Sequence, residues 1–227
     1  MFKGAIFDLD GVIVNTVPIH FKAWRKLFTK YGEKFTFQDY KTKVDGIPGL
    51  NGARAILAPF RGPVRVPRNK LPEKEVVKAA NKKRKYFLEF LKKEKIPVFK
   101  STVKLIKELR RKKIKIAAIS SSKVAKHILK KTKLFNLFDT VVTGDEITKG
   151  KPDPQIFLLA AKRLKLKPKD CVVFEDALLG VEAAKKAKMF CLGIDHYNDP
   201  LRLKKAILIV KDLKEINYNK LKQLYNR

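Results

Sequence analysis

The chain is poor in cysteine and has no long apolar run, and each shortage excludes a class of protein. Its 227 residues include only Cys171 and Cys191, both within apolar stretches, so a disulfide framework is not indicated. No apolar run approaches the roughly 18 residues of a membrane span. Asp8 and Asp10 interrupt the amino-terminal apolar stretch, unlike in a signal peptide. We therefore expect a cytoplasmic protein with no membrane partner.

Acidic residues are also scarce, which leaves the chain strongly basic. It has 22 Asp and Glu against 53 Lys and Arg, a formal net charge of +31. Such a charge can indicate nucleic-acid, membrane or acidic partners. The basic residues recur from Lys3 to Arg227 without a basic tail or an arginine-rich motif. We interpret them as a solvated surface that can draw in anionic substrates, with no specific nucleic-acid partner. A basic nucleic-acid-binding protein is the alternative from another class.

An apolar run of strand type, residues 5–8, ends in two carboxylates. One apolar residue separates Asp8 from Asp10, and Gly11 then permits a turn. Positions two apart in an extended segment point the same way, so both carboxylates should project together. The carboxyl ends of strands are where open α/β sheets hold their ligands. A strand that simply ends in a polar turn is the alternative interpretation.

Beyond residue 96, short apolar strands alternate with helical segments. Strands are predicted over 114–119, 140–143, 171–174, 190–194 and 206–210, and helices over 101–112, 123–132, 154–164 and 178–188. This alternation predicts βαβ units and an α/β fold with a doubly wound, Rossmann-like parallel sheet.

The segment between the first strand and residue 96 has a different, mostly helical pattern. Helices are predicted over 18–31 and 73–94, a mixed region over 35–57, and a proline-rich loop over 59–72. We therefore expect two domains. Residues 1–14 and 96–227 would form the α/β catalytic core, and 15–95 would be an inserted helical cap domain.

Polar residues also follow the later strands of the predicted core. Ser120 ends one strand, Glu175 and Asp176 end another, and Lys151 lies in a turn before a helix. If these loops share one edge of the sheet with Asp8 and its neighbour, one pocket holds four carboxylates, an ammonium and a hydroxyl. Two carboxylates about 4 Å apart repel by roughly 4 kcal/mol at an effective dielectric constant of ~20. A hard divalent cation relieves this repulsion, and oxygen-only ligands favour Mg²⁺ over zinc. A cation beside Lys and Ser suits a phosphoryl group.

Each of these residues also has a simpler interpretation. Lys151 is one of very many lysines, and Ser120 is a plausible ordinary turn residue. Glu175 and Asp176 precede a predicted helix, whose amino terminus acids stabilise.

Four motifs together resemble those of the haloacid dehalogenase superfamily, most closely the β-phosphoglucomutase-like branch with a helical cap. They are Asp-x-Asp-Gly-Val at 8–12, a strand ending in Ser120, Gly-Lys-Pro-Asp-Pro at 150–154, and Val-Phe-Glu-Asp-Ala-x-x-Gly-Val-x-Ala-Ala at 173–184. The resemblance covers essentially the whole chain. Each motif is weak alone, but their order and their positions at the ends of elements make the combination specific.

The resemblance implies catalytic roles for the matched residues. Asp8 would be the nucleophile that forms an aspartyl phosphate. Asp10 would be the general acid and base. Ser120 would bind the phosphoryl oxygens, and Lys151 would balance their charge and that of Asp8.

The resemblance also implies a Mg²⁺ site and a set of substrate contacts. The metal would be held by Asp8, the backbone carbonyl of Asp10, Asp176, and Glu175 either directly or through its neighbours. The candidate substrate-binding residues are His20, Trp24, Lys83, Ser121 and Ser122.

Some positions depart from the family pattern or remain without a role. Gly49 stands where relatives usually carry a phosphate-binding arginine, and Arg54 is a conceivable substitute. His127 and His196 are interpreted as structural.

We expect a Mg²⁺-dependent phosphotransferase, as a monomer or weak dimer, that hydrolyses small phosphorylated metabolites resembling sugar phosphates. A β-phosphoglucomutase-type phosphomutase is the alternative, because the two activities share a first half-reaction. They differ in whether water or a sugar hydroxyl takes the phosphoryl group. Dehalogenase chemistry is disfavoured, because it needs neither the acidic pair at 175–176 nor the second aspartate at position 10.

Overall fold

The computed structural model describes residues 1–30, 32–45, 47, 49–57 and 72–226. These residues form two compact units. One comprises Met1–Asn15 and Pro97–Arg227, and the other Thr16–Ile96. Nearly all of the loop predicted over 59–72 lies outside the described residues, as do Gly46 and Pro48 of the mixed region.

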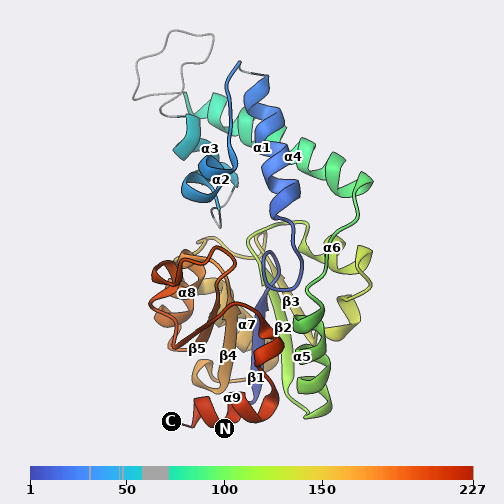
Figure 1. The fold of residues 1–227 in the computed structure, drawn as a ribbon, viewed down its shortest axis with the longest axis vertical. Coiled ribbons are helices and arrows are strands. Elements are labelled where there is room, and N and C mark those ends of the chain that lie inside the picture. Colours follow the sequence, from blue (N-terminus) through green and yellow to red (C-terminus); the bar gives the residue numbers. More distant parts are fainter. Residues whose placement is uncertain (31, 46, 48, 58–71, 227) are drawn as a thin grey trace. The chain divides into compact units, whose positions relative to one another are not determined.

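The first unit is built on a parallel sheet of six strands in the order β3-β2-β1-β4-β5-β6 (Figure 1). The strands are β1 (Gly4–Asp8), β2 (Lys115–Ser120), β3 (Thr140–Thr143), β4 (Cys171–Glu175), β5 (Phe190–Ile194) and β6 (Leu208–Val210). Strands buried on both faces have nearly continuous apolar sequences, as β1 and β4 do. The predicted doubly wound α/β fold is confirmed.

Helices pack on both faces of this sheet. They are α5 (Lys100–Arg111), α6 (Ala125–Lys131), α7 (Gln155–Leu164), α8 (Leu178–Lys186) and α9 (Tyr218–Tyr225). Helices α7 and α8 share one apolar cluster with the strand residues Ile6 and Val173. The alternate strand positions face the other side, where Phe7 and Phe174 stack with ring centroids 4.3 Å apart.

The register of the strands brings the polar strand ends to one edge. Asp8 is paired with Ile119, one residue before Ser120. Phe7 is paired with Phe174, one residue before Glu175. Because all strands run parallel, their carboxyl ends meet at the same edge of the sheet.

The second unit contains the helices α1 (Val17–Thr29), α2 (Phe37–Lys43), α3 (Gly49–Leu57) and α4 (Glu73–Lys93). Two ion pairs link α1 to the α4 region, Lys22 with Glu94 at 2.8 Å and Lys26 with Glu89 at 3.1 Å. In the described part of the mixed region, two short helices are present, α2 and α3. None of the described helices combines the length and apolar character that a bilayer crossing requires.

Candidate active site

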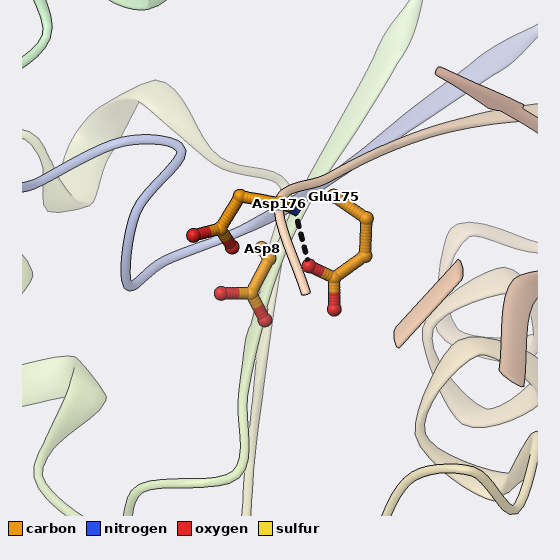
Figure 2. Close-up of side chains that lie close together, drawn as sticks. All are labelled: Asp8, Glu175 and Asp176. Atoms are coloured by element: carbon orange, nitrogen blue, oxygen red, sulfur yellow. Dashed lines mark hydrogen bonds between the residues drawn. The ribbon is translucent and has the colours of Figure 1, made fainter. Parts of the chain in front are cut away.

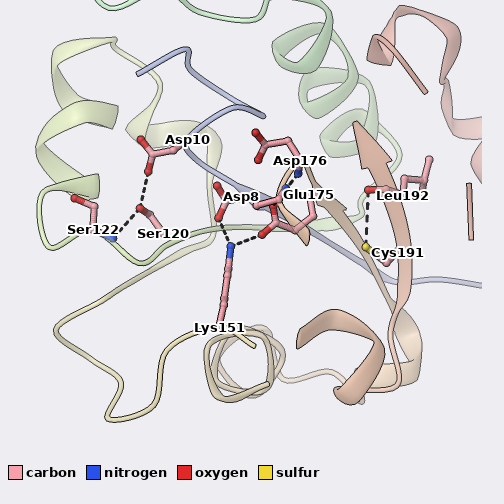
Figure 3. A network of polar contacts seen from close by, with 10 residues as sticks. Asp8, Asp10, Ser120, Ser122, Lys151, Glu175, Asp176, Cys191 and Leu192 are labelled. Atoms are coloured by element: carbon pink, nitrogen blue, oxygen red, sulfur yellow. Dashed lines mark hydrogen bonds and ion pairs between the residues drawn. The ribbon is translucent and has the colours of Figure 1, made fainter. Parts of the chain in front are cut away.

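An ammonium group lies between two buried carboxylates at the carboxyl edge of the sheet (Figure 3). Lys151 reaches this edge from the loop before α7. Its Nζ donates a hydrogen bond to Oδ1 of Asp8 at 2.6 Å and a second, shorter one to Oε1 of Glu175. All three side chains are buried. The predicted helix start differs slightly, since α7 begins at Gln155 and Asp153 accepts its backbone N–H.

Burial and the neighbouring charges shift the pKa values of Asp8 and Lys151. Burial raises the pKa of Asp8 to about 8, with the neighbouring carboxylates of Glu175 and Asp10 adding to the rise and Lys151 opposing it. For Lys151, burial lowers the pKa, but the charges of Asp8 and Glu175 outweigh it and raise the pKa above its ordinary value. The ammonium therefore stays charged, and the site has more negative than positive groups.

Glu175 is held on both of its carboxylate oxygens. While Oε1 accepts from Lys151, Oε2 accepts the backbone N–H groups of Asp176 at 2.8 Å and Ala177 at 3.3 Å. The side chain is completely buried. Gly180 in the first turn of α8 leaves the room that this carboxylate fills. Because its two oxygens are both hydrogen-bonded, Glu175 fixes the positions of the Lys151 ammonium and of the Asp176 backbone.

Asp8, Glu175 and Asp176 converge on a volume suited to a metal ion (Figure 2). One ligand oxygen from each lies within 4.8 Å of the others. Gly11, with φ of +85°, lets the loop pass against the Asp176 carboxylate, which a Cβ atom there would overlap. Three carboxylates with oxygen-only donors and a deficit of positive charge fit a hard divalent cation.

Asp10 and Ser120 form a second polar pair beside the first. Ser120 Oγ donates to Oδ2 of Asp10 at 2.9 Å and accepts the backbone N–H of Ser122 at 3.0 Å. Ser121 is half-buried, and its carbonyl packs closely against Gly144. The hydroxyl proton of Ser120 is thus directed at Asp10, and the core residues predicted from the motifs lie together.

The substrate contacts predicted for the helical insertion form a cluster inside the second unit. Lys83 is buried, and its Nζ lies 2.7 Å from Nδ1 of His20 and 5.1 Å from the centroid of the Trp24 ring. His20 stacks on Phe87, with centroids 4.1 Å apart. A lysine only donates, so Nδ1 accepts and the imidazole is neutral. Burial and the nearby charge of Lys83 hold the pKa of His20 well below its usual range.

Arg54, suggested as a substitute for an arginine at position 49, is engaged within the same unit. It is exposed and donates to both carboxylate oxygens of Glu73 and to Asn51. In this structure the guanidinium of Arg54 therefore donates to Glu73 and Asn51 within its own unit.

The sequence pattern placed Phe87 only on the apolar side of its helix and assigned no role to Gly180, although both residues shape these clusters. Gly180 stands within the fourth motif, five residues after Glu175 and in the first turn of α8. That position is a signal that a close approach requires glycine. Phe87 lies four residues after Lys83, so the two share a face of α4.

The fold and the acidic edge define a doubly wound α/β enzyme, and comparison with known proteins identifies its family. Residues 2–188 match the model of the haloacid dehalogenase-like hydrolases. A phosphorylated carbohydrates phosphatase from Thermotoga maritima is 33% identical over 185 residues, covering 82% of this chain and 81% of that protein. A β-phosphoglucomutase from Bacillus subtilis is 33% identical over 192 residues, covering 85% and 83%.

A solved structure agrees with these relatives along the whole chain. The β-phosphoglucomutase of Clostridium difficile superposes with a TM-score of 0.87 at 29% identity, covering 100% of this chain and 98% of that one. The chain therefore belongs to the haloacid dehalogenase-like hydrolase family, in its β-phosphoglucomutase-like branch. The resemblance drawn from the four motifs is confirmed.

Proposed function

We propose that this chain is a Mg²⁺-dependent phosphatase of small phosphorylated metabolites, sugar phosphates among them, working through an aspartyl phosphate on Asp8. The observation that carries the proposal is the buried cluster of Asp8, Lys151 and Glu175 beside Asp176. It combines a candidate nucleophile with a fixed positive charge. The relative from Thermotoga, named for phosphorylated carbohydrates, agrees with the substrate class.

In the first half-reaction, a carboxylate oxygen of Asp8 attacks phosphorus and the bond from phosphorus to the ester oxygen breaks. Asp10 gives its proton to the departing oxygen. The ammonium of Lys151, held at 2.6 Å from Asp8, balances the charge of the nucleophile and of the phosphoryl oxygens. Ser120, which is hydrogen-bonded to Asp10, would bind the phosphoryl oxygens.

In the second half-reaction, Asp10 takes a proton from water as the water oxygen attacks phosphorus. The bond between phosphorus and Asp8 then breaks, which frees inorganic phosphate and restores both aspartates. Asp8, Asp176 and the Asp10 carbonyl would hold Mg²⁺, with Glu175 supporting them through its contacts to Lys151 and to the backbone. When bound, the cation supplies the positive charge that this acidic edge lacks.

The cap residues His20, Trp24 and Lys83, together with Ser121 and Ser122 of the core, are proposed to contact the substrate. The buried pair of Lys83 and His20 presents an ammonium and an imidazole N–H, both donors suited to phosphate or hydroxyl oxygens.

A β-phosphoglucomutase activity is the second candidate, favoured by the TM-score of 0.87 to such an enzyme over the whole chain. The mutase would share the first half-reaction, with a sugar hydroxyl taking the place of water in the second. The balance between the two depends on how well water is excluded from the site.

One screen separates these activities. The purified protein is incubated with a panel of phosphorylated metabolites and Mg²⁺, and both phosphate release and isomer formation are measured. Phosphate release without isomers supports the phosphatase, and isomers with little phosphate support the mutase. Asp8→Asn should abolish either activity with an unchanged circular dichroism spectrum, and turnover by this variant would refute the covalent mechanism.

A further inference from the structure

A histidine outside the proposed catalytic set touches the loop that carries Asp10. His196 follows β5, and its Nε2 lies 2.5 Å from the carbonyl oxygen of Gly11. A carbonyl oxygen only accepts, so Nε2 carries the proton and donates it. Gly11 directly follows Asp10 in the chain and has φ of +85°. Fixing its carbonyl therefore restricts the peptide units that orient Asp10.

The same imidazole packs on the returning segment of the chain. His196 stacks on Phe99 with ring centroids 5.0 Å apart and planes within 15°. Phe99 donates its backbone N–H to Ile13 at 3.0 Å, and Val14 and Val98 form an antiparallel bridge. His196 thus contacts both segments at the point where they are hydrogen-bonded to each other.

The backbone on either side of His196 is anchored. Asp195 donates its N–H to the carbonyl of Val210 at 2.8 Å. Its buried carboxylate accepts the N–H of Tyr197 at 3.0 Å. His196 itself is an exposed residue. A side chain that is exposed but directed onto one carbonyl contributes little to the hydrophobic core.

We propose that His196 is a positioning residue that holds the loop of Asp8, Asp10 and Gly11 in its working geometry by donating to the Gly11 carbonyl. In this role it acts through the backbone and takes no proton in the reaction. The expected effect of His196 on kcat depends on the proposed phosphotransferase function. Its expected effect on the stability of the loop does not.

Two substitutions separate the hydrogen bond from the ring stacking. His196→Phe keeps an aromatic ring against Phe99 but cannot donate, whereas the amide of His196→Gln can still reach the Gly11 carbonyl. We expect His196→Phe to lower kcat about tenfold with KM within about twofold, because small displacements of reacting groups are costly. We expect His196→Gln to recover kcat to within about threefold of the wild type. His127→Phe, at an exposed position of α6, is the matched control and should leave kcat unchanged.

A second readout needs no activity. The amide of Gly11 donates to Val14 at 2.8 Å, and that of Val14 to Leu9 at 3.0 Å. Their hydrogen exchange, followed by NMR, should be about tenfold faster in His196→Phe and near wild type in His196→Gln. Equal exchange and equal kcat in both variants and the wild type would overturn the proposal. So would equal impairment of both variants, which would mean that a donor at this position does not restore the loop. Wild-type behaviour of His196→Phe with impairment of His196→Gln would likewise overturn it, because ring packing alone would then account for the effect. An inactive wild type with the expected exchange pattern would instead count against the proposed function alone.

Discussion

The carboxylate of Glu175 fills the space that a side chain at residue 180 would need. A Cβ atom on Gly180 would overlap Oε1 and Cδ of Glu175. The same Oε1 accepts from Lys151, and the opposite oxygen accepts from the backbone of Asp176. One glycine in the first turn of α8 therefore controls the geometry of an ammonium and of a candidate metal ligand.

Gly180→Ala should displace Glu175 and disturb both of these contacts. We expect kcat for a phosphomonoester to fall at least about tenfold. The free energy of unfolding should fall by about 1–3 kcal/mol, as for other overpacked sites. Steady-state kinetics and urea unfolding measure the two effects. Lys186→Ala, at an exposed position of the same helix, is the control. Wild-type kinetics in Gly180→Ala would show that Glu175 has freedom to move without consequence.

Lys151→Met tests the ammonium that joins Asp8 to Glu175. The substitution leaves two buried carboxylates without their common cation. Breaking a buried ion pair from one side costs about 3–5 kcal/mol, so the free energy of unfolding should fall by about that amount in urea. Turnover should be lost as well.

The control for this substitution is Lys149→Met, an exposed lysine two residues away. Its unfolding free energy should stay within about 0.5 kcal/mol of the wild type. If Lys151→Met were as stable as this control, the ammonium would not be needed to hold the two carboxylates together.

The convergence of the polar strand ends could be predicted because it follows from topology. Asp8, Ser120 and Glu175 each end an apolar strand, and parallel strands bring their carboxyl ends to one edge. The resemblance implied that Lys151 balances the charge of Asp8, and the two side chains are hydrogen-bonded. The second contact of Lys151 with Glu175 and the hydrogen bond from Ser120 to Asp10 could not be predicted. Such choices depend on ångström-scale packing that spacing along the chain does not encode.

Contacts between segments far apart in the chain could not be predicted from the sequence pattern either. Helix α9 was not predicted, since only Leu221 within it is buried, and it packs through Tyr218 and Tyr225 on Phe2 at the other end of the chain. The pair of His20 and Lys83 joins residues 63 positions apart. Local propensity carries no information about partners at such separations.

Asp10→Asn should slow departure of the leaving oxygen, because an amide has no acidic proton to give. The rate with a sugar phosphate, whose alcohol is a poor leaving group, should fall about 10²–10⁴-fold. The leaving oxygen of an aryl phosphate with an acidic phenol needs less protonation, so the rate with that substrate should fall much less. Comparing kcat/KM for both substrates measures the difference. Equal losses for the two would show that Asp10 does not act as the general acid. Because Ser120 donates to Oδ2 of Asp10, Ser120→Ala serves as a comparison that leaves the acid in place.

The depressed pKa of His20 predicts how the stability of the protein depends on pH. Burial and the charge of Lys83 both oppose protonation of His20 in the folded chain, whereas a histidine in the unfolded chain has a pKa of about 6.5. As the pH falls through about 6.5, the unfolded state takes up a proton that the folded state refuses, so the free energy of unfolding decreases. Stability measured between about pH 8 and pH 5 should thus fall less steeply in His20→Gln than in the wild type. His127→Gln, at an exposed position of α6, should retain the wild-type slope. Superimposable profiles for His20→Gln and the wild type would mean that the imidazole titrates freely despite its 2.7 Å contact with Lys83.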